Sequence, residues 1–318
     1  MAGERRDETR GEPQVLVPYP GPDGSGDVQD IFVYLRPETN GVLVESTLLK
    51  VIEKCRKDRS SIKLIYLANI PGDFILRNHI VERHYAQKFY FAVHGKRAFT
   101  GSMRERVEAY FGVVWDETTV IGGFEALNIL HKTPEELHST WVSASDHLVT
   151  DGQSIKRIDG ILVVNYDMPA LLAKNSRSTD IAVMLFRCTD YDLFEEVVDL
   201  MHEALVEKGV LGRNVPASRA FHYSKGPFEQ LLDAVDYLYA SGPEPVPLES
   251  LSFVQYAATR GFTLGDLLGV VRNPIGLFDD DGGEFREDNI FIYTADDSYA
   301  ESIDKLEHLR AQLWTRRY

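Results

Sequence analysis

The residues best suited to chemistry lie near the C-terminus, in a segment that begins Asn-Ile-Phe-Ile-Tyr-Thr-Ala-Asp-Asp-Ser at Asn289. The apolar run from Asn289 to Tyr293 predicts a short strand. Asp296, Asp297 and Ser298 are residue types that cap helices, and apolar residues spaced by three and four then predict a helix to the chain end. A helix that starts after a polar turn offers backbone N–H groups to an anion. The alternative is an ordinary capped turn without a ligand.

Composition limits the classes of protein to which this chain can belong. It has 318 residues, with 34 Lys and Arg against 49 Asp and Glu, a formal net charge of −15. Such a field repels nucleic acid and anionic membranes, although a local basic patch could still bind phosphate. Cys55 and Cys188 are too few for a disulfide framework. No apolar run reaches the length of a membrane span, and the polar N-terminus lacks a signal-peptide core, so we expect a cytoplasmic protein.

The N-terminal part predicts alternating strands and helices. A strand is expected over 30–35, because apolar residues dominate it before the Pro-Glu-Thr-Asn-Gly turn. One apolar face then predicts a helix over 44–55, and a second strand follows at 62–68. Helices are expected over 74–85 and 102–111. Residues 1–28, rich in Gly, Pro and charge, predict a disordered tail.

The middle of the chain carries further candidates. Strands are predicted over 119–124, 161–165 and 181–187, and the last is the most apolar. Tyr191 to Val206 is an amphipathic helix with a regular apolar face. Another helix is expected over 228–239, before a proline-rich linker at 242–247.

The chain resembles the nucleoside diphosphate kinase family at several points. The family carries its catalytic histidine in a pattern close to N-x-I-H-G-S-D-S, which is similar to Ile292-Tyr293-Thr294-Ala295-Asp296, and the later Glu-Ser pair is similar to Glu301-Ser302. Tyr293 stands where the phosphorylated histidine belongs, and Ala295 stands at the serine position. The resemblance therefore implies a retained turn and a lost nucleophile.

The N-terminal elements resemble the same family in the same order. The strand that ends Arg36-Pro-Glu is similar to the family's K-P-D, Ile62-Lys-Leu-Ile is similar to F-K-L-V, and His84-Tyr85-Ala matches H-Y-A. Lys96-Arg97-Ala98-Phe-Thr-Gly resembles P-F-F-x-G, with Ala98 at the base-stacking phenylalanine. The segment Val271-Arg272-Asn-Pro-Ile-Gly resembles T-I-R-G-D-F, in which the arginine binds phosphate.

This resemblance implies a site and its ligand. It would bring together Arg36, Arg97 and Arg272, whose guanidinium groups suit bidentate phosphate contact, although three solvated surface arginines are the alternative. The implied phosphate- or nucleotide-binding set is Arg36, Tyr85, Arg97, Arg272 and Thr294. The ligand would be phosphate or a nucleotide, the latter with Mg²⁺; no protein metal site is expected.

The expected fold is α+β, with a ferredoxin-like antiparallel sheet covered by helices on one face and a large α/β insertion. The kinase-like domain would comprise 29–112 and 263–318, sharing one core, and the insertion or second subdomain would comprise 113–262. The family's third strand could be 119–124 or 181–187, and we favour 181–187.

Three functions remain open at this point. The favoured one is a catalytically degenerate kinase-like unit that binds or scaffolds, with weak phosphate or nucleotide binding and no phosphotransfer. The second is an active enzyme that uses the same pocket on a nucleotide or phosphate. The third is a structural subunit of a homo-oligomer. We expect a protein partner or self-association, and neither nucleic acid nor membrane as partner.

Overall fold

The computed structural model describes residues 11–23, 28–58, 62–189, 191–279 and 283–313. The chain forms two compact units, each assembled from segments distant in sequence. Unit 1 comprises Met1–Ile80, Ser176–Val271 and Thr294–Leu306, and unit 2 comprises Val81–Asn175, Arg272–Tyr293 and Glu307–Tyr318. The predicted domain boundaries near 112 and 262 do not coincide with the positions at which the chain passes from one unit to the other.

Unit 1 is built on a five-stranded antiparallel sheet in the order β1-β3-β8-β2-β9. Its strands are β1 (Gln14–Val17), β2 (Gln29–Leu35), β3 (Ile62–Ile70), β8 (Ile181–Cys188) and β9 (Phe221–Tyr223). Helix α1 (Val42–Asp58) connects β2 to β3, and α9 (Tyr191–Glu207) precedes β9. Strand β8 separates β2 from β3, and β2 separates β8 from β9, which is the ferredoxin-like split βαβ arrangement. The predicted α+β class is confirmed, and 181–187 is the third strand of this arrangement.

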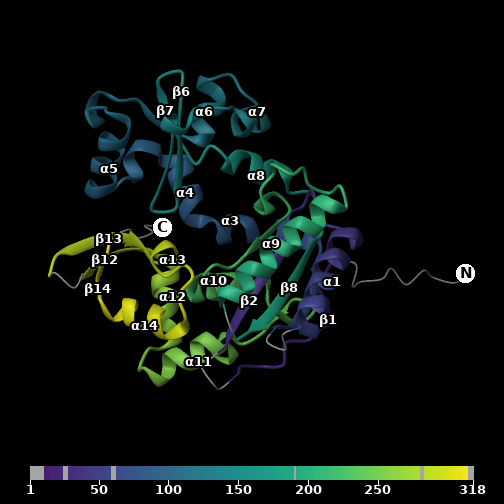
Figure 1. Cartoon of the computed structure of the whole chain (residues 1–318). Coiled ribbons are helices and arrows are strands. Elements are labelled where there is room, and N and C mark those ends of the chain that lie inside the picture. Colours follow the sequence, from purple (N-terminus) through teal and green to yellow (C-terminus); the bar gives the residue numbers. More distant parts are fainter. Residues whose placement is uncertain (1–10, 24–27, 59–61, 190, 280–282, 314–318) are drawn as a thin grey trace, which may run out of the picture. The chain divides into compact units, whose positions relative to one another are not determined.

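Helices cover both faces of this sheet, whereas the sequence predicted helices on one face. Ile31, Val33 and Leu35 point to the face on which α1 and α9 pack side by side (Figure 1). The alternating residues Phe32 and Tyr34 point to the other face. There, α10 (Pro227–Tyr237) and α11 (Ser252–Thr259) pack on β2. The physical reason is that every residue of β2 is buried, so both faces need a cover.

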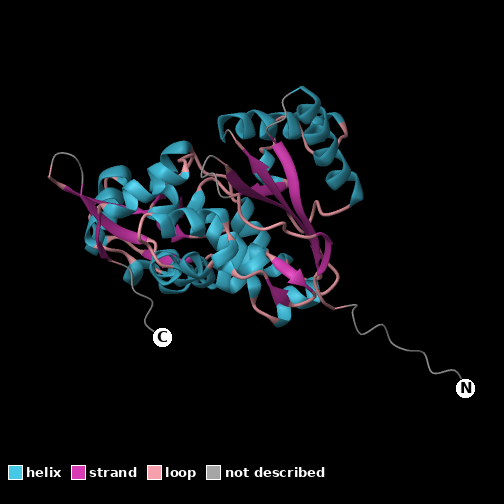
Figure 2. Cartoon of the chain, turned by 90° about the horizontal axis from the view of Figure 1, so that it is seen from below, coloured by secondary structure: helices cyan, strands magenta, loops and turns pink. Residues whose placement is uncertain are grey.

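Unit 2 contains two sheets. The first has the order β4-β7-β6-β5 and pairs β4 with β7 in parallel; the second is the antiparallel meander β13-β12-β14. Phe91, Met103 and Trp115 form a core with residues of the first sheet and with Ile275 of β12. The mixture of helices and strands is visible in Figure 2. The strands are β4 (Val120–Gly122), β5 (His147–Thr150), β6 (Gln153–Ile158), β7 (Ile161–Val164), β12 (Ile275–Asp279), β13 (Phe285–Asn289) and β14 (Leu309–Gln312).

The remaining elements are short. They are α2 (Gly72–Arg77), α3 (Ile80–His84), α4 (Ala86–His94), α5 (Gly101–Phe111), α6 (Gly123–Ile129), α7 (Pro134–Ser139), α8 (Met168–Lys174), α12 (Leu264–Arg272), α13 (Ile290–Tyr293), α14 (Tyr299–Glu307), β10 (Tyr239–Ser241) and β11 (Glu244–Pro245). His79, at φ 50°, separates α2 from α3 where one helix was expected.

The tail prediction is wrong for part of 1–28. Val15 and its neighbours form β1, which pairs with β3, whereas residues 1–10 and 24–27 lie outside the described residues. The run Gln-Val-Leu-Val lies between Pro13 and Pro18. Prolines beside a strand are tolerated at a sheet edge, because an edge strand pairs on one side only and needs only half of its backbone N–H groups for pairing.

Two C-terminal predictions are also wrong. The run after Asn289 is helix α13, and Asn289 ends β13, which pairs with β12 rather than within the sheet of Asp30. The final helix ends at Glu307, and Leu309 begins β14. Three-and-four spacing placed Leu309 on a helix face, but its backbone pairs with Phe278 of β12. Tertiary pairing overrides local periodicity here.

Candidate functional site

The predicted site residues fall in both units. Arg36 and Thr294 belong to unit 1, whereas Tyr85, Arg97, Arg272 and Tyr293 belong to unit 2.

The unit 2 residues lie on different elements. Tyr85 immediately precedes α4, and its ring packs edge-on against His84 with centroids 4.8 Å apart. Arg97 is exposed in a short 3₁₀ turn, and Arg272 is exposed at the last position of α12.

Tyr293, predicted at the nucleophile position, ends the short helix α13. Its ring lies 4.9 Å from that of Phe278, and the Arg286 guanidinium lies 5.1 Å from its centroid. These contacts are those of a packed aromatic residue with a cation on its face. The position on a helix also separates Tyr293 from the strand end expected of a nucleophile.

The residues after Thr294 already cap the N-terminus of the helix that follows, α14. Ser298 N–H donates to the Glu301 carboxylate at 2.9 Å, and Glu301 N–H donates to the Ser298 hydroxyl at 3.3 Å, a capping box at the start of α14. The hydrogen bond from the Ser298 backbone lowers the pKa of Glu301. A carboxylate therefore holds the place that an external anion would take. Thr294 itself is buried.

Arg36 lies beside the last strand of the split βαβ arrangement. Its backbone N–H donates to the Ala220 carbonyl at 2.8 Å, and its Nε donates to the Ser218 carbonyl at 3.2 Å. Because side chains alternate along a strand, Arg36 continues the face of β2 that carries Tyr34. Arg36 thus marks one end of β9, and Thr294 contacts the turn beyond the other end.

That strand carries a histidine that the sequence analysis had not placed in a site. His222 pairs with Tyr34 across β9 and β2, and the rings stack with centroids 4.5 Å apart. Two carboxylate oxygens of α10 lie 3.7 Å from His222 Nε2, one from Glu229 and one from Asp233. The Asp233 side chain is fully buried, and the His222 side chain is 18% exposed, so the imidazole is enclosed but reaches the surface.

A tight turn fixes this histidine relative to α10. Ser224 pairs with Phe32 through both its backbone N–H and its hydroxyl, and Lys225 N–H donates to Glu229 at 2.7 Å. A Cβ on Gly226 would lie 2.2 Å from the Thr294 carbonyl oxygen. Only glycine fits there, and Pro227 then starts the helix, as proline often does.

This arrangement suits nucleophilic chemistry at imidazole. A carboxylate facing Nε2 favours the tautomer that carries its proton there, which leaves the lone pair on Nδ1. Cationic groups occur at both ends of β9: Arg36 at its start, the exposed Arg213 and Arg219 in the preceding connection, and Lys225 after it. Guanidinium and ammonium groups neutralise phosphate charge.

The sequence does contain a signal for His222. Ala-Phe-His-Tyr at 220–223 is a short run before Ser-Lys-Gly-Pro and an amphipathic helix, the strand-turn-helix pattern that was assigned to residue 289 onward. The resemblance at 289–302 drew attention away from it. Only the pairing of β9 with β2 identifies 221–223 as the fourth strand.

A second cluster of titratable groups lies in unit 2. Lys156 Nζ lies 3.9 Å from the Tyr166 ring centroid and donates to the carbonyls of His138 and Thr140, while Tyr166 OH lies 3.2 Å from His147 Nε2. Burial lowers the pKa of Lys156 and raises that of Tyr166 to about 12. Two carbonyls and an aromatic face accept the three ammonium protons. We therefore regard Lys156 as a structural clamp on the end of α7.

Comparisons with known proteins add no relative: no family model, curated protein or solved structure matches the chain. Within the described ranges, no three His, Cys, Asp or Glu residues are arranged to hold a metal ion. Within the same ranges, every helix is too short or too polar to cross a bilayer.

Proposed function

We propose that unit 1 is a phosphate-handling domain in which His222 accepts a phosphoryl group from a nucleoside triphosphate. The observation that carries this proposal is the placement of His222 on the last strand of a ferredoxin-like sheet, with Asp233 facing its Nε2. The expectation of a lost nucleophile rested on Tyr293, which lies on a helix rather than on that strand.

The step is an in-line displacement at phosphorus. His222 Nδ1 donates its lone pair to the terminal phosphorus, the bond to the bridging oxygen breaks, and the nucleoside diphosphate leaves with that electron pair. Asp233 and Glu229 stabilise the positive imidazole that results. A second diphosphate then attacks the phosphohistidine and regenerates the imidazole. Magnesium would accompany the nucleotide as its counter-ion.

The second candidate is phosphate or nucleotide binding without transfer, the unit acting as a degenerate kinase-like binding protein. It is favoured by the same two carboxylates, because they repel an approaching phosphate while the imidazole is neutral. In that case His222 serves structurally, its ring stacked on Tyr34.

The test is formation of phosphohistidine in the full chain. The protein is incubated with Mg²⁺ and γ-labelled ATP or GTP, and the label is followed through alkali, which spares phosphohistidine, and acid, which releases it. We expect alkali-stable label in the wild type and in Tyr293→Phe, and none in His222→Gln.

The matched control is His202→Gln, on α9 of the same unit, where His202 Nε2 lies 2.8 Å from the Val215 carbonyl oxygen. It should keep the label. Absence of label in the wild type, together with calorimetric binding of pyrophosphate that weakens in Arg36→Ala, would favour the second candidate. Absence of both label and binding would overturn the proposal.

A further inference from the structure

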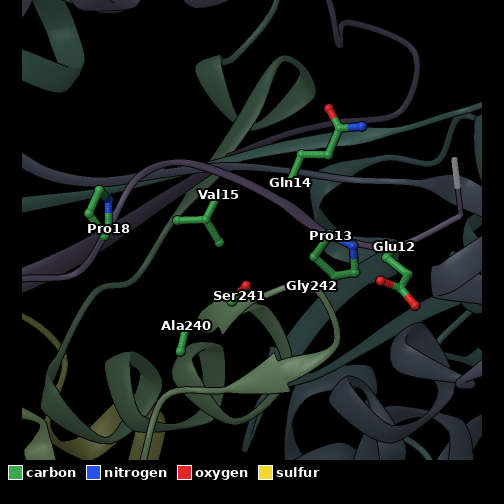
Figure 3. A pocket seen from close by; sticks show the side chains of 8 residues that line it. All are labelled: Glu12, Pro13, Gln14, Val15, Pro18, Ala240, Ser241 and Gly242. Carbon is green, nitrogen blue, oxygen red and sulfur yellow. The ribbon is translucent and has the colours of Figure 1, made fainter. Parts of the chain in front are cut away.

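The cavity between β1 and the β10–β11 hairpin lies against the side-chain face of the unit 1 sheet (Figure 3). The Tyr66 hydroxyl of β3 donates to the Tyr237 carbonyl at 3.2 Å and accepts from the Tyr239 N–H at 3.1 Å, which holds the start of the hairpin on that face. Glu12 is the single ionisable residue of the lining. One carboxylate does not select a ligand, so this cavity is a gap between packed elements.

Another hollow of unit 1 is a groove between helices α1 and α9, which pack side by side on the sheet (Figure 1). It has a volume of 270 Å³ and is lined by residues within 47–55 of α1 and within 200–208 of α9. Strands β2 and β3 both run antiparallel to β8, as β9 does to β2. Because α1 links β2 to β3 and α9 links β8 to β9, the two helices run antiparallel to each other.

Opposite charges line the two sides of this groove. Lys50 and Lys54 are exposed on α1, and Glu203 and Glu207 are exposed on α9. The members of each pair are spaced by one helical turn, so both pairs repeat with the same rise of about 6 Å along their helices. Within the described part of the chain, none of these four side chains is joined in an ion pair. A surface that fits the groove therefore carries an acidic row opposite α1 and a basic row opposite α9.

We propose that this α1–α9 face binds a second copy of the chain across a two-fold axis parallel to the helices. Such an axis places α1 of each copy over α9 of the other. Lys50 and Lys54 then face Glu203 and Glu207 of the other copy, and the contact occurs twice, as in every isologous interface. Leu200, which is 43% exposed, comes to lie over α1 of the other copy. A groove with charges of one sign on both sides would lack this self-complementarity.

The size and charge of the face set the expected strength of the dimer. Helices α1 and α9 have 17 residues each, a length of about 25 Å, and two such helices side by side span about 20 Å. Contact over this face buries roughly 500 Å² per copy, at the low end of specific interfaces, so we expect a dissociation constant in the micromolar range. The net charge of −15 opposes association, but salt screens that repulsion beyond about 8 Å. This inference is independent of the chemistry of the β9 site.

The test measures the mass of the full chain in solution by sedimentation equilibrium at about 1–200 μM, a range that includes the expected dissociation constant. The wild type should shift from 36.0 kDa toward twice that mass as its concentration rises. Lys50→Glu with Lys54→Glu should weaken the dimer about tenfold or more, and so should Glu203→Lys with Glu207→Lys, because each double variant opposes like charges. An equimolar mixture of the two double variants should regain the wild-type association, because each altered row then meets its complement.

The matched control is Glu105→Lys with Glu117→Lys, at exposed residues of unit 2. It changes the net charge as much as the α9 double variant does, and it should keep the wild-type association. Three results would overturn the proposal. One is a wild type that stays at 36.0 kDa at every concentration, and another is charge variants that associate as well as the wild type. The third is a mixture of the two double variants that stays monomeric, since α1 of one copy would then not lie over α9 of the other.

Discussion

Asp30 illustrates how a single buried charge is held in unit 1. Arg187 donates to both of its carboxylate oxygens, at 2.7 and 2.9 Å, and Ser252 donates a further bond at 2.7 Å. The same carboxylate raises the pKa of Tyr19, although burial of that phenol contributes more. Bidentate geometry with satisfied lone pairs is the condition under which a buried pair is stable.

Removal of Arg187 should therefore destabilise the protein strongly. Arg187→Ala leaves the Asp30 carboxylate buried without its cation, and we expect a loss of about 3–5 kcal/mol in the free energy of unfolding, measured with urea. The matched control is Arg260→Ala, whose partner Asp304 is 60% exposed, with an expected loss of about 1 kcal/mol or less. Equal losses in the two variants would show that the buried Asp30–Arg187 pair contributes no more to stability than an exposed ion pair.

His147 should give unit 2 a pH dependence. Burial lowers its pKa below the ordinary 6.5, and the nearby Lys156 ammonium lowers it further. As the pH falls below 6.5, the unfolded chain therefore takes up a proton before the folded chain does. The contribution of the neutral His147 imidazole to stability is therefore fully present above the unfolded pKa of 6.5. It is lost as the pH falls from that value to the lower pKa of the folded chain.

His147→Gln should flatten the decline of unfolding free energy between about pH 7 and pH 5. Urea titrations at several pH values measure it, and the exposed His131→Gln serves as the matched control. An unchanged slope in His147→Gln would mean that other groups carry the pH dependence.

At the scale of elements, the turn between β9 and α10 is set by one close approach. Gly226→Ala would place a methyl group 2.2 Å from the Thr294 carbonyl oxygen, which is backbone and cannot yield easily. We expect a loss of about 1–3 kcal/mol in unfolding free energy. Gly269→Ala, inside α12 with nothing within 4 Å of the new Cβ, should instead gain about 0.5–1 kcal/mol. A neutral Gly226→Ala would show that the two turns move apart readily.

The elements predicted best were those with long and uniform patterns. The strand at 181–187 and the helix after Tyr191 were predicted nearly to their ends, because a continuous apolar run and a regular apolar face leave few alternatives. Short elements were not predicted well. Three residues define β9 and four define β1, too few for periodicity to distinguish a strand from a loop.

The site was harder to predict than the fold because it depends on pairing across long sequence separations. Arg36 could be expected beside the sheet, since it directly follows a strand, but its contact with Ser218 joins residues 182 positions apart. His222 becomes a candidate only when β9 is seen to pair with β2 and α10 is seen to bring Asp233 to it. Local sequence carries no information on either partnership.

At the scale of the whole molecule, the ferredoxin-like sheet is split by a long intervening segment. In the sheet, strand β8 lies between β2 and β3 and pairs with both. In the sequence, more than one hundred residues separate β8 from β3, and most of these residues belong to unit 2. Ile70 and Ile181 are directly paired, so the end of β3 and the start of β8 are neighbours within unit 1. Such closely spaced ends are what a tolerated insertion requires.

This arrangement predicts the behaviour of two shortened chains. A chain that ends at Gly112 contains β2 and β3 but lacks β8, the strand between them, so neither strand can bury its apolar faces. We expect no cooperative thermal transition. A chain in which a hairpin loop of about four residues joins Ile70 to Ile181 restores the β3–β8 pair, because paired residues at a hairpin end need only about 2–5 connecting residues. It should unfold cooperatively and keep unit 1's near-ultraviolet circular dichroism. Cooperative unfolding of the Gly112 chain would mean that the N-terminal segment folds without β8, and that the split βαβ sheet is not the folding unit.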